Sequence, residues 1–250
     1  MKILMISDVH ADARLFGVPR FAEVETVMRA SVSVAIEREV DAFCFLGDLC
    51  DPDSGVSVFR CVRLLIECHR RLKAKGIRLI CISGNHDVVE DGSGETTMEP
   101  LKAVDPHVVY DRPEWTAIGP VGCGPAKGTV PCLVLPFTPA SHAVDAAEFV
   151  EKTWDKATQG CRDVLVLTHL SLKGALLGSE SAEMARGREV TYPAQEIEKL
   201  AADRNQRLHQ YAGHFHLRQR VGSVRVVGAP CRFTYGEATH EPGFVIAEIP

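Results

Sequence analysis

Short apolar runs alternate with segments of helical periodicity over the first third of the chain. Three of the runs are almost continuously apolar, as expected of strands buried on both faces of a parallel sheet, and they cover residues 2–6, 42–46 and 77–82. Between them, apolar residues recur at helical spacing from residue 21 to about 40 and from 58 to about 75. This order of strand, helix, strand, helix, strand predicts a parallel sheet whose strands are joined by crossover helices.

A second set of short β segments predicts a second sheet. The set comprises residues 107–110, 115–119, 130–135, 163–168, 208–212, 218–221, 224–228 and 244–248. Helices are expected at 143–156 and 194–202, and a loop with a short helix is expected at 88–104. Residues 171–192 are polar, contain glycine and lack periodicity, so we expect a flap near the functional site whose role the sequence leaves open.

The size and composition are those of an ordinary globular protein. With 250 residues and 46% hydrophobic residues, the chain can bury one sizeable core, and we expect one domain over residues 1–250 with no separate capping domain. No apolar run approaches the roughly 20 residues that cross a bilayer, and the N-terminal apolar run is too short for a signal peptide. Nine scattered cysteines without a CxxC pair indicate a reducing cytoplasm. The net charge of -5 argues mildly against a large nucleic-acid surface.

Polar side chains of the metal-binding type follow five of the predicted strands. The first two, Asp8 and His10, are two residues apart, so they leave the same face of an extended segment. The other positions, in chain order, are Asp48, Asn85, His86, Asp87, His169, His214 and His216. Because the carboxyl ends of parallel strands meet at one edge of a sheet, these side chains are predicted to converge.

Any one of these residues alone would more often cap a helix or close a polar turn. We assign such ordinary roles to the remaining histidines, which are His69, His107, His142, His209 and His240. The recurrence of the signal at successive strand ends is what favours a metal site.

Seven of the residues supply enough ligands for two neighbouring six-coordinate ions once waters are added. We assign Asp48 as the bridge between the ions, because two ions need a shared ligand and a carboxylate is the natural one. One ion is assigned to Asp8, His10 and His216, and the other to Asn85, His169 and His214. Nitrogen and oxygen donors without a thiolate favour manganese, with iron or zinc as alternatives, over magnesium.

The predicted chemistry is hydrolysis of a phosphoester. Two divalent ions about 3.5 to 4 Å apart can grip a phosphate and hold the attacking oxygen in line with the leaving group. His86 adjoins a ligand without being one, so we expect it to protonate the leaving group. Asp87 is expected to orient His86.

The motifs DxH, GD, GNHD, a strand-end His and GHxH occur in that order between residues 8 and 216. This ordered set resembles the calcineurin-like metallophosphoesterase superfamily. The resemblance implies an α/β fold, a two-sheet β-sandwich flanked by helices in four layers (αββα), with a dinuclear metal centre and phosphoester hydrolysis. The ligand assignment above agrees with the superfamily's pattern residue by residue.

Three segments of the C-terminal third carry a narrower resemblance. Residues 168–171, 211–216 and 227–237 are similar to the SbcD family of DNA-repair exonucleases, in which a strand followed by an aromatic and an acidic residue closes the domain. Asp51, three residues after Asp48, also resembles the bacterial members. This resemblance implies manganese-dependent cleavage of DNA ends together with an SbcC-type ATPase partner.

Three functional hypotheses follow. The first is a manganese-dependent DNA exonuclease or endonuclease of the SbcD type, acting in DNA repair or recombination. The second is a small-molecule phosphatase or a cyclic-nucleotide phosphodiesterase of the same superfamily. The third is a non-catalytic scaffold, in which eroded ligands would be expected. Basic residues clustered beside the metal edge would favour the first hypothesis, and a closed pocket would favour the second.

Overall fold

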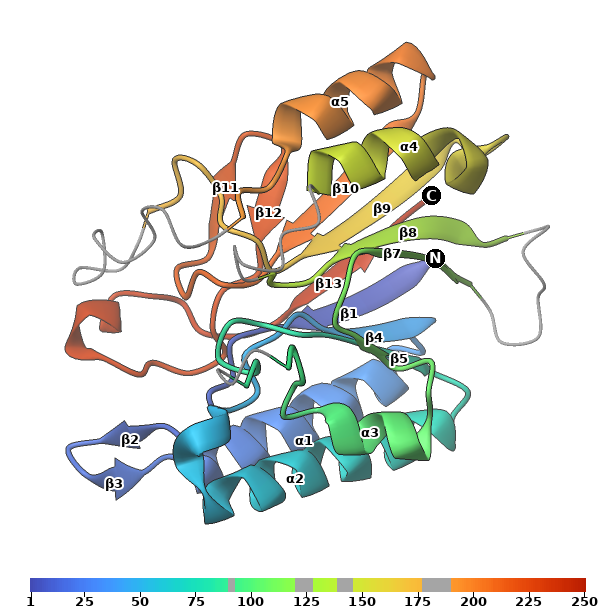
Figure 1. Ribbon diagram of the computed structural model, residues 1–250. Coiled ribbons are helices and arrows are strands. Elements are labelled where there is room, and N and C mark those ends of the chain that lie inside the picture. Colours follow the sequence, from blue (N-terminus) through green and yellow to red (C-terminus); the bar gives the residue numbers. More distant parts are fainter. Residues whose placement is uncertain (90–92, 120–127, 139–145, 177–189) are drawn as a thin grey trace.

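Two β-sheets lie face to face between two layers of helices (Figure 1). The computed structural model describes residues 1–89, 93–119, 128–138, 146–176 and 190–250. Helices α1, α2 and α3 cover the outer face of one sheet, and α4 and α5 cover the outer face of the other. The four-layer αββα sandwich predicted from the sequence is therefore confirmed.

The first sheet has the strand order β13-β1-β4-β5-β6. Its strands are β13 (Val245–Glu248), β1 (Lys2–Ile6), β4 (Ala42–Phe45), β5 (Arg78–Ile82) and β6 (Val109–Tyr110). Strands β1, β4, β5 and β6 run parallel to one another. Strand β13 pairs antiparallel with β1, with Lys2 opposite Glu248. The connections between β1, β4 and β5 contain α1 (Phe21–Glu37) and α2 (Val56–Lys73), as the periodicity predicts.

The second sheet has the strand order β11-β12-β10-β9-β8-β7. Its strands are β11 (Gln219–Val221), β12 (Val224–Val226), β10 (Arg207–Ala212), β9 (Asp163–Thr168), β8 (Val130–Leu135) and β7 (Glu114–Ile118). The four central strands are parallel, and β7 and β11 pair antiparallel at the two edges. Helices α4 (Ala146–Thr158) and α5 (Ala194–Asp203) precede β9 and β10.

Two strands belong to a different sheet from the one predicted. The segments 107–110 and 244–248 were expected in the second sheet, but β6 pairs with β5 and β13 pairs with β1, both in the first sheet. A short apolar run shows that a strand is buried without specifying its neighbour, because the partner is chosen by the surrounding tertiary structure.

Two smaller elements complete the part of the chain that positions the site. Strands β2 (Arg14–Leu15) and β3 (Val18–Pro19) form a hairpin that the sequence pattern does not predict, since two-residue strands carry no measurable alternation. Helix α3 (Glu99–Val104) is the short helix expected within 88–104. Most of the predicted 171–192 flap, residues 177–189, lies outside the described residues.

The core is divided into three layers by the alternation of side chains along each strand. In β4, Phe43 and Phe45 pack towards α1 and α2, whereas Cys44 lies between the sheets. On the far side, Trp154 of α4 and Ile197 of α5 are fully buried against the second sheet. Both sheets are covered on both faces, which explains why their central strands read as continuous apolar runs rather than alternating ones. Within the described residues, no helix is both long and apolar enough to span a bilayer.

Candidate metal centre

The loops that follow β1 and β4 are bonded to each other through their backbones. The amide of Asp8 donates to the carbonyl of Gly47 at 2.9 Å, and the amides of Val9 and His10 donate to the carbonyl of Asp48 at 3.0 and 3.1 Å. These bonds continue the pairing of β1 with β4 beyond the strands. They place Asp8 and His10 directly beside Asp48 at the carboxyl edge of the sheet.

Four predicted metal ligands have a left-handed backbone conformation. Their φ angles are 53° for Asp8, 38° for His10, 60° for Asp48 and 73° for His214. Residues other than glycine rarely adopt this conformation, which persists only where the surrounding structure enforces it and which concentrates at functional sites. The left-handed backbone at these four residues therefore costs conformational free energy, and it directs their side chains towards the predicted metal centre.

Two glycines allow the loops to approach closely. A Cβ atom on Gly84 would lie 2.5 Å from the amide nitrogen of Asp48, and one on Gly213 would lie 2.6 Å from the carbonyl oxygen of Leu46. Glycine is required at position 84 for steric reasons, because any side chain there would push the GNHD loop away from Asp48.

Asp8, His10 and His216 form the first ligand cluster. Their ligand atoms all lie within 4.8 Å of one another, and the Nε2 atoms of His10 and His216 are 3.0 Å apart. The Asp8 carboxylate is fully buried, and neither of its oxygens has a hydrogen-bond partner among the described residues, although the Ser7 hydroxyl is nearby. A buried carboxylate without a partner is costly, and a cation held between it and two imidazoles would satisfy all three groups.

Asn85, His169 and His214 form the second cluster. The Oδ1 atom of Asn85 lies 3.2 Å from Nε2 of His169 and 2.9 Å from Nδ1 of His214. Nδ1 of His169 donates to the carbonyl of Leu46, which leaves Nε2 available as a ligand atom.

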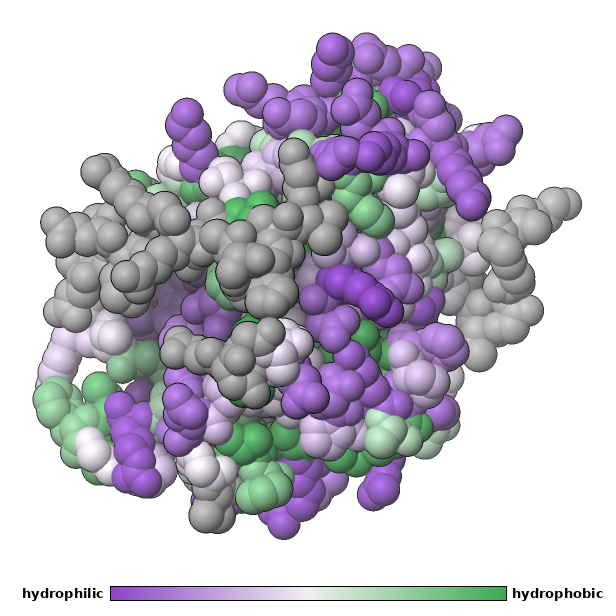
Figure 2. Space-filling view, in the orientation of Figure 1, coloured by the Kyte–Doolittle hydropathy of each residue, from purple (hydrophilic) through white to green (hydrophobic). Residues whose placement is uncertain are grey.

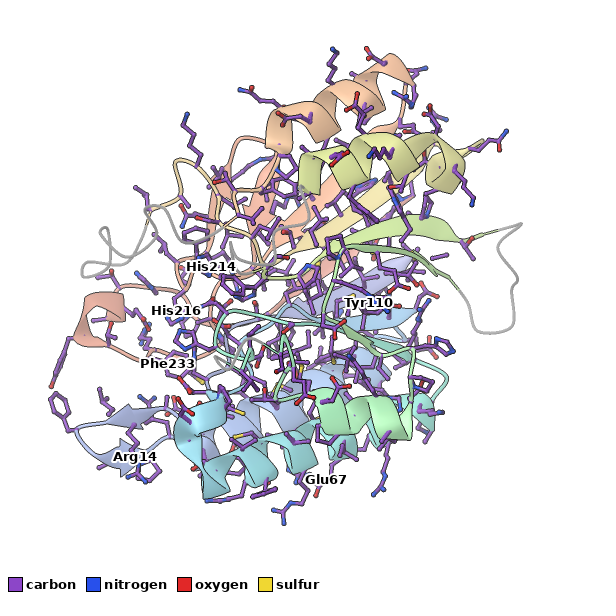
Figure 3. All side chains as sticks on the ribbon, viewed as in Figure 1. Arg14, Glu67, Tyr110, His214, His216 and Phe233 are labelled. Carbon is purple, nitrogen blue, oxygen red and sulfur yellow. The ribbon has the colours of Figure 1, made fainter. Side chains whose placement is uncertain are left out.

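Asp48 lies between the two clusters. Its Oδ2 atom is 3.6 Å from Nε2 of His10, and its Oδ1 atom is 3.3 Å from Nε2 of His169. One carboxylate oxygen thus faces each cluster, which is the arrangement required of a bridging ligand. The seven residues fit a pair of divalent ions, with nitrogen and oxygen donors and no thiolate. Figure 3 shows His214, His216 and Phe233 in succession at the end of the sheets where this centre lies.

The ionisable groups of the centre perturb one another strongly. Burial raises the pKa of Asp8 and lowers that of His10 to about 3. Burial also opposes ionisation of Asp48, but the adjacent imidazoles, His169 first, outweigh it and hold the pKa of Asp48 well below its usual range. Burial opposes protonation of His169 in turn, yet Asp48 raises the pKa of this imidazole to about 10. Perturbed pKa values of this kind, caused by burial together with a specific charged partner, are typical of functional sites.

His86 lies at the surface of the centre. Its side chain is 46% exposed, and its ring meets the ring of His10 edge-on with centroids 4.9 Å apart. The backbone amide of His86 donates to Oδ1 of Asp48 at 2.9 Å. The imidazole therefore adjoins the predicted ligands while remaining accessible from solvent.

The contacts of Asp87 differ from the predicted ones. Its buried carboxylate accepts hydrogen bonds at 2.8 Å from the amides of Asp48, Leu49 and Gly84, and one at 3.2 Å from the Thr97 hydroxyl. The expectation that Asp87 orients His86 is corrected accordingly, since Asp87 instead ties the loop after β5 to the loop after β4. Burial raises the pKa of Asp87 to about 6, against the opposing effect of these amides.

Asp51 is the carboxylate nearest to the His86 ring among the described ion pairs. Its Oδ2 atom lies 3.8 Å from Nδ1 of His86. The sequence marked Asp51 only through its spacing from Asp48, and the structure places it where it can orient His86.

Glu237 is a site residue that the sequence did not assign. Its Oε1 atom lies 2.8 Å from Nδ1 of His216, and its Oε2 atom accepts a hydrogen bond at 2.6 Å from the amide of Phe233. Burial opposes ionisation of Glu237, but its contact with His216 keeps the carboxyl pKa below its ordinary value. Such a partner fixes the ring so that Nε2 faces the ligand cluster. The available signal was the acidic residue of the SbcD-like closing segment.

The cysteines near the centre are packing residues. Cys50 and Cys81 are buried, and the pKa of the Cys81 thiol is raised well above its usual value by burial. A thiol that stays protonated is neither a nucleophile nor a metal ligand.

Comparison with known proteins agrees with this geometry. A profile of the calcineurin-like phosphoesterase family matches residues 1–218. No curated protein sequence matches the chain significantly.

Many solved structures match the chain, and two of them illustrate the shared fold. A dimetal phosphatase from Danio rerio is 12% identical with a TM-score of 0.56, over 91% of this chain and 87% of that one. Purple acid phosphatase PPD1 from yellow lupin (Lupinus luteus) seeds is 13% identical with a TM-score of 0.52, over 87% of this chain and 38% of that one. At this identity the likeness concerns the fold, and the activities named are those of the two phosphatases. The family profile, in contrast, spans every predicted ligand, and the chain belongs to the calcineurin-like phosphoesterases.

Proposed function

We propose that this protein is a manganese-dependent phosphodiesterase that cleaves DNA, in the manner of the SbcD nucleases. Membership of the calcineurin-like family makes the chain a hydrolase of phosphoric esters, and the family implies two divalent ions. The proposal adds the metal, the diester and the DNA substrate.

One observation carries the choice of DNA. Residues 227–237, through which the sequence resembles the SbcD nucleases, adjoin the metal centre: Phe233 lies 5.4 Å from the His10 ring, and Glu237 bonds His216. The SbcD-like segment thus contacts the predicted ligands His10 and His216, which supports an SbcD-like substrate.

The roles of the residues follow from their positions. Asp8, His10 and His216 would hold one ion, Asn85, His169 and His214 the other, and Asp48 would bridge them. Bound ions would neutralise the phosphate and activate the attacking water. The chain itself supplies a buried, preorganised frame, so that little rearrangement accompanies the reaction.

His86 is the proposed general acid. Asp51 faces its Nδ1 atom, which leaves Nε2 to pass a proton to the departing oxygen. The solvent exposure of His86 suits a large substrate, because a strand passing over the centre can reach the imidazole.

A partner belongs to the same proposal. SbcD-type nucleases act with an SbcC-type ATPase, and we propose such a partner here. A small-molecule phosphodiesterase or phosphatase is the competing outcome of the experiment below.

The test is cleavage of end-labelled duplex DNA with manganese, run in parallel with hydrolysis of bis-p-nitrophenyl phosphate. Wild-type protein is compared with His86→Ala and with His107→Ala, a control at an exposed histidine. We expect wild type and control to degrade DNA from its ends and His86→Ala to lose this activity. Hydrolysis of the small diester alone would overturn the DNA assignment in favour of a small-molecule phosphodiesterase, and hydrolysis of neither would overturn the diester assignment as well.

A further inference from the structure

The β2–β3 hairpin carries a phenylalanine at its tip. Phe16 and Gly17 are the two residues between the strands, and the Phe16 side chain is 77% exposed. Val18 beside it is 63% exposed. Figure 2 shows apolar side chains gathered at the lower left, where Figure 1 places this hairpin.

The backbone at the tip is unfavourable for phenylalanine. The φ angles of Phe16 and Gly17 are 49° and 78°, so both turn residues are left-handed. Two-residue hairpin turns with this conformation favour Asn, Asp or Gly at the first position, because a bulky side chain is strained there. An exposed aromatic residue at a turn position that disfavours bulky side chains indicates that the ring itself has a role.

A second exposed aromatic residue faces the first from a distant segment. Tyr235 is 78% exposed, and its ring centroid lies 5.6 Å from that of Phe16, with the ring planes inclined by 54°. The two rings form an open V whose faces remain largely in solvent. Contact between them does not bury them, so mutual packing does not account for both.

The aromatic pair is connected to the metal centre on both sides. Phe16 lies six residues after the predicted ligand His10, and Tyr235 lies two residues after Phe233, whose ring is 5.6 Å from that of His216. A hydrogen bond of 3.0 Å from Arg20 to the carbonyl of Arg232 joins the base of the hairpin to the second segment. Two residues of chain span at most about 7 Å between Cα atoms, so the backbone of Tyr235 lies close to that of Phe233.

A groove adjoins the pair. Its volume is about 440 Å³, within the range of small-ligand sites, and its lining includes Leu15, Arg20, Glu23, Arg232 and Tyr235. Arg14 (Figure 3) is exposed on the same hairpin and donates to the carbonyl of Gly17 at 2.9 Å. Arg20 is paired with Glu23, and Arg232 donates to the carbonyl of His240, so the match to a nucleotide rests on the apolar ring faces, on which any nucleobase can stack.

We propose that Phe16 and Tyr235 form a stacking platform for a nucleobase of the phosphodiester bound at the metal centre. This inference rests on the proposed phosphodiesterase function and deepens it, since it assigns the residues that recognise a nucleoside. Stacking is tolerant of sequence because every base offers a π face. The platform therefore selects nucleotides over simple diesters without selecting a base.

The test compares two substrates with the same p-nitrophenolate leaving group. Thymidine 5′-(p-nitrophenyl phosphate) carries a base, and methyl p-nitrophenyl phosphate does not. In the Phe16→Gly/Tyr235→Ala double variant, we expect KM for the thymidine substrate to rise about tenfold with little change in kcat. The values for the methyl substrate should match wild type. Tyr235→Phe, which retains a ring, should behave as wild type with both substrates.

A second measurement is independent of catalysis. Fluorescence anisotropy of a labelled oligothymidylate in EDTA should show the Kd rising about tenfold in the double variant. Phe16→Gly relieves the strained backbone, so the variant should keep or raise the Tm of wild type, which separates loss of stacking from loss of folding.

The outcomes separate this inference from the proposed function. If wild type hydrolyses both substrates and the double variant keeps both the nucleoside preference and the oligonucleotide affinity, the platform is overturned while the phosphodiesterase stands. If wild type hydrolyses neither substrate, the proposed function fails, and the anisotropy result alone decides for or against the platform.

Discussion

Strands β9 and β10 carry similar residues at their two ends, but the environments differ. At the amino end, Asp163 accepts hydrogen bonds from Arg207 at 2.5 Å and from His209 at 2.9 Å, and the two basic side chains are 44% and 20% exposed. At the carboxyl end, His169 is fully buried, and His214 has a left-handed backbone. The neighbouring Asp8 carboxylate has no hydrogen-bond partner in the described part of the chain.

The difference shows what distinguishes a structural ion pair from a metal centre. At the amino end, the buried acid and its more exposed basic partners satisfy one another's hydrogen bonds. At the carboxyl end, burial, strained backbone and unpartnered acceptors coincide, so the protein alone does not satisfy the groups. Histidine and aspartate form a structural ion pair where the protein completes their hydrogen bonds, and they are candidates for metal ligands where it does not.

The largest effect is expected from removing the bridge. Asp48→Ala takes away the carboxylate that faces both clusters, so phosphodiesterase activity should fall by more than about 1,000-fold, and bound metal measured by elemental analysis should drop. Asp53→Ala, at an exposed acid nearby, is the matched control. Retention of full metal content by Asp48→Ala would refute the bridging role.

Gly84→Ala tests the close packing of the loops at the carboxyl end. The added Cβ would lie 2.5 Å from the amide nitrogen of Asp48 and 2.9 Å from Cε1 of His169. We expect a loss of about 1–3 kcal/mol in the free energy of unfolding, measured by denaturant titration, together with weaker metal binding. An unchanged denaturation midpoint would show that the two loops can accommodate a methyl group at position 84.

Glu237→Ala removes the residue that fixes the His216 ring. Metal affinity should fall about 10- to 100-fold, measured by titration calorimetry with manganese. Glu237→Gln keeps an acceptor for Nδ1 of His216 and should lose less. Glu241→Gln, at an exposed glutamate, is the control, and equal affinities in all three variants would contradict the positioning role.

Removing metal should destabilise the protein, because ions that bind only the folded state stabilise it by mass action. Saturation at about 100 times the Kd of one ion contributes roughly 2.7 kcal/mol. Chelation should therefore lower the Tm by about 5–10 °C in scanning calorimetry. A Tm indifferent to EDTA would mean that the clusters do not hold ions.

The smallest effect is expected at the amino end. Burial works to raise the pKa of Asp163, but hydrogen bonds from Arg207 and His209 outweigh it and hold this pKa below its ordinary value. A lowered carboxyl pKa stabilises the fold above the unfolded value of about 3.9, and the contribution disappears as the pH falls through the folded value. Asp163→Asn should cost at most about 1 kcal/mol at pH 7 and nothing in strong acid, measured by urea unfolding. A larger loss of unfolding free energy, or a loss of activity, would contradict the purely structural role given to the amino end of these strands.

The sequence predicted the features that follow from strand periodicity and strand ends. Asp8 and Asp48 lie far apart in the chain, but each follows an apolar run, so the rule that parallel strands end at one edge of a sheet brought them together. His169 follows a strand of the second sheet, and its place beside Asp48 depends on how the two sheets stack. The same reasoning assigned β6 and β13 to the wrong sheet, because a run of apolar residues does not specify which strand it pairs with.

The remaining site residues depend on contacts that no spacing encodes. Asp87 adjoins His86 in sequence, yet its carboxylate turns towards the amides of another loop. Glu237 lies 21 residues after His216 and reaches it only through the fold of the C-terminal segment. Partners of this kind become visible only once the tertiary structure is known.

The pairing of β1 with β13 has a consequence for how the protein is made. Lys2 lies opposite Glu248, so the strand that leads into Asp8 and His10 keeps one edge free until β13 has been synthesised. Contacts of such sequence separation form slowly, and an unpaired edge exposes a growing chain to misassembly. The first sheet is therefore completed only after the second sheet has been synthesised, and fragments that lack β13 expose the free edge of β1.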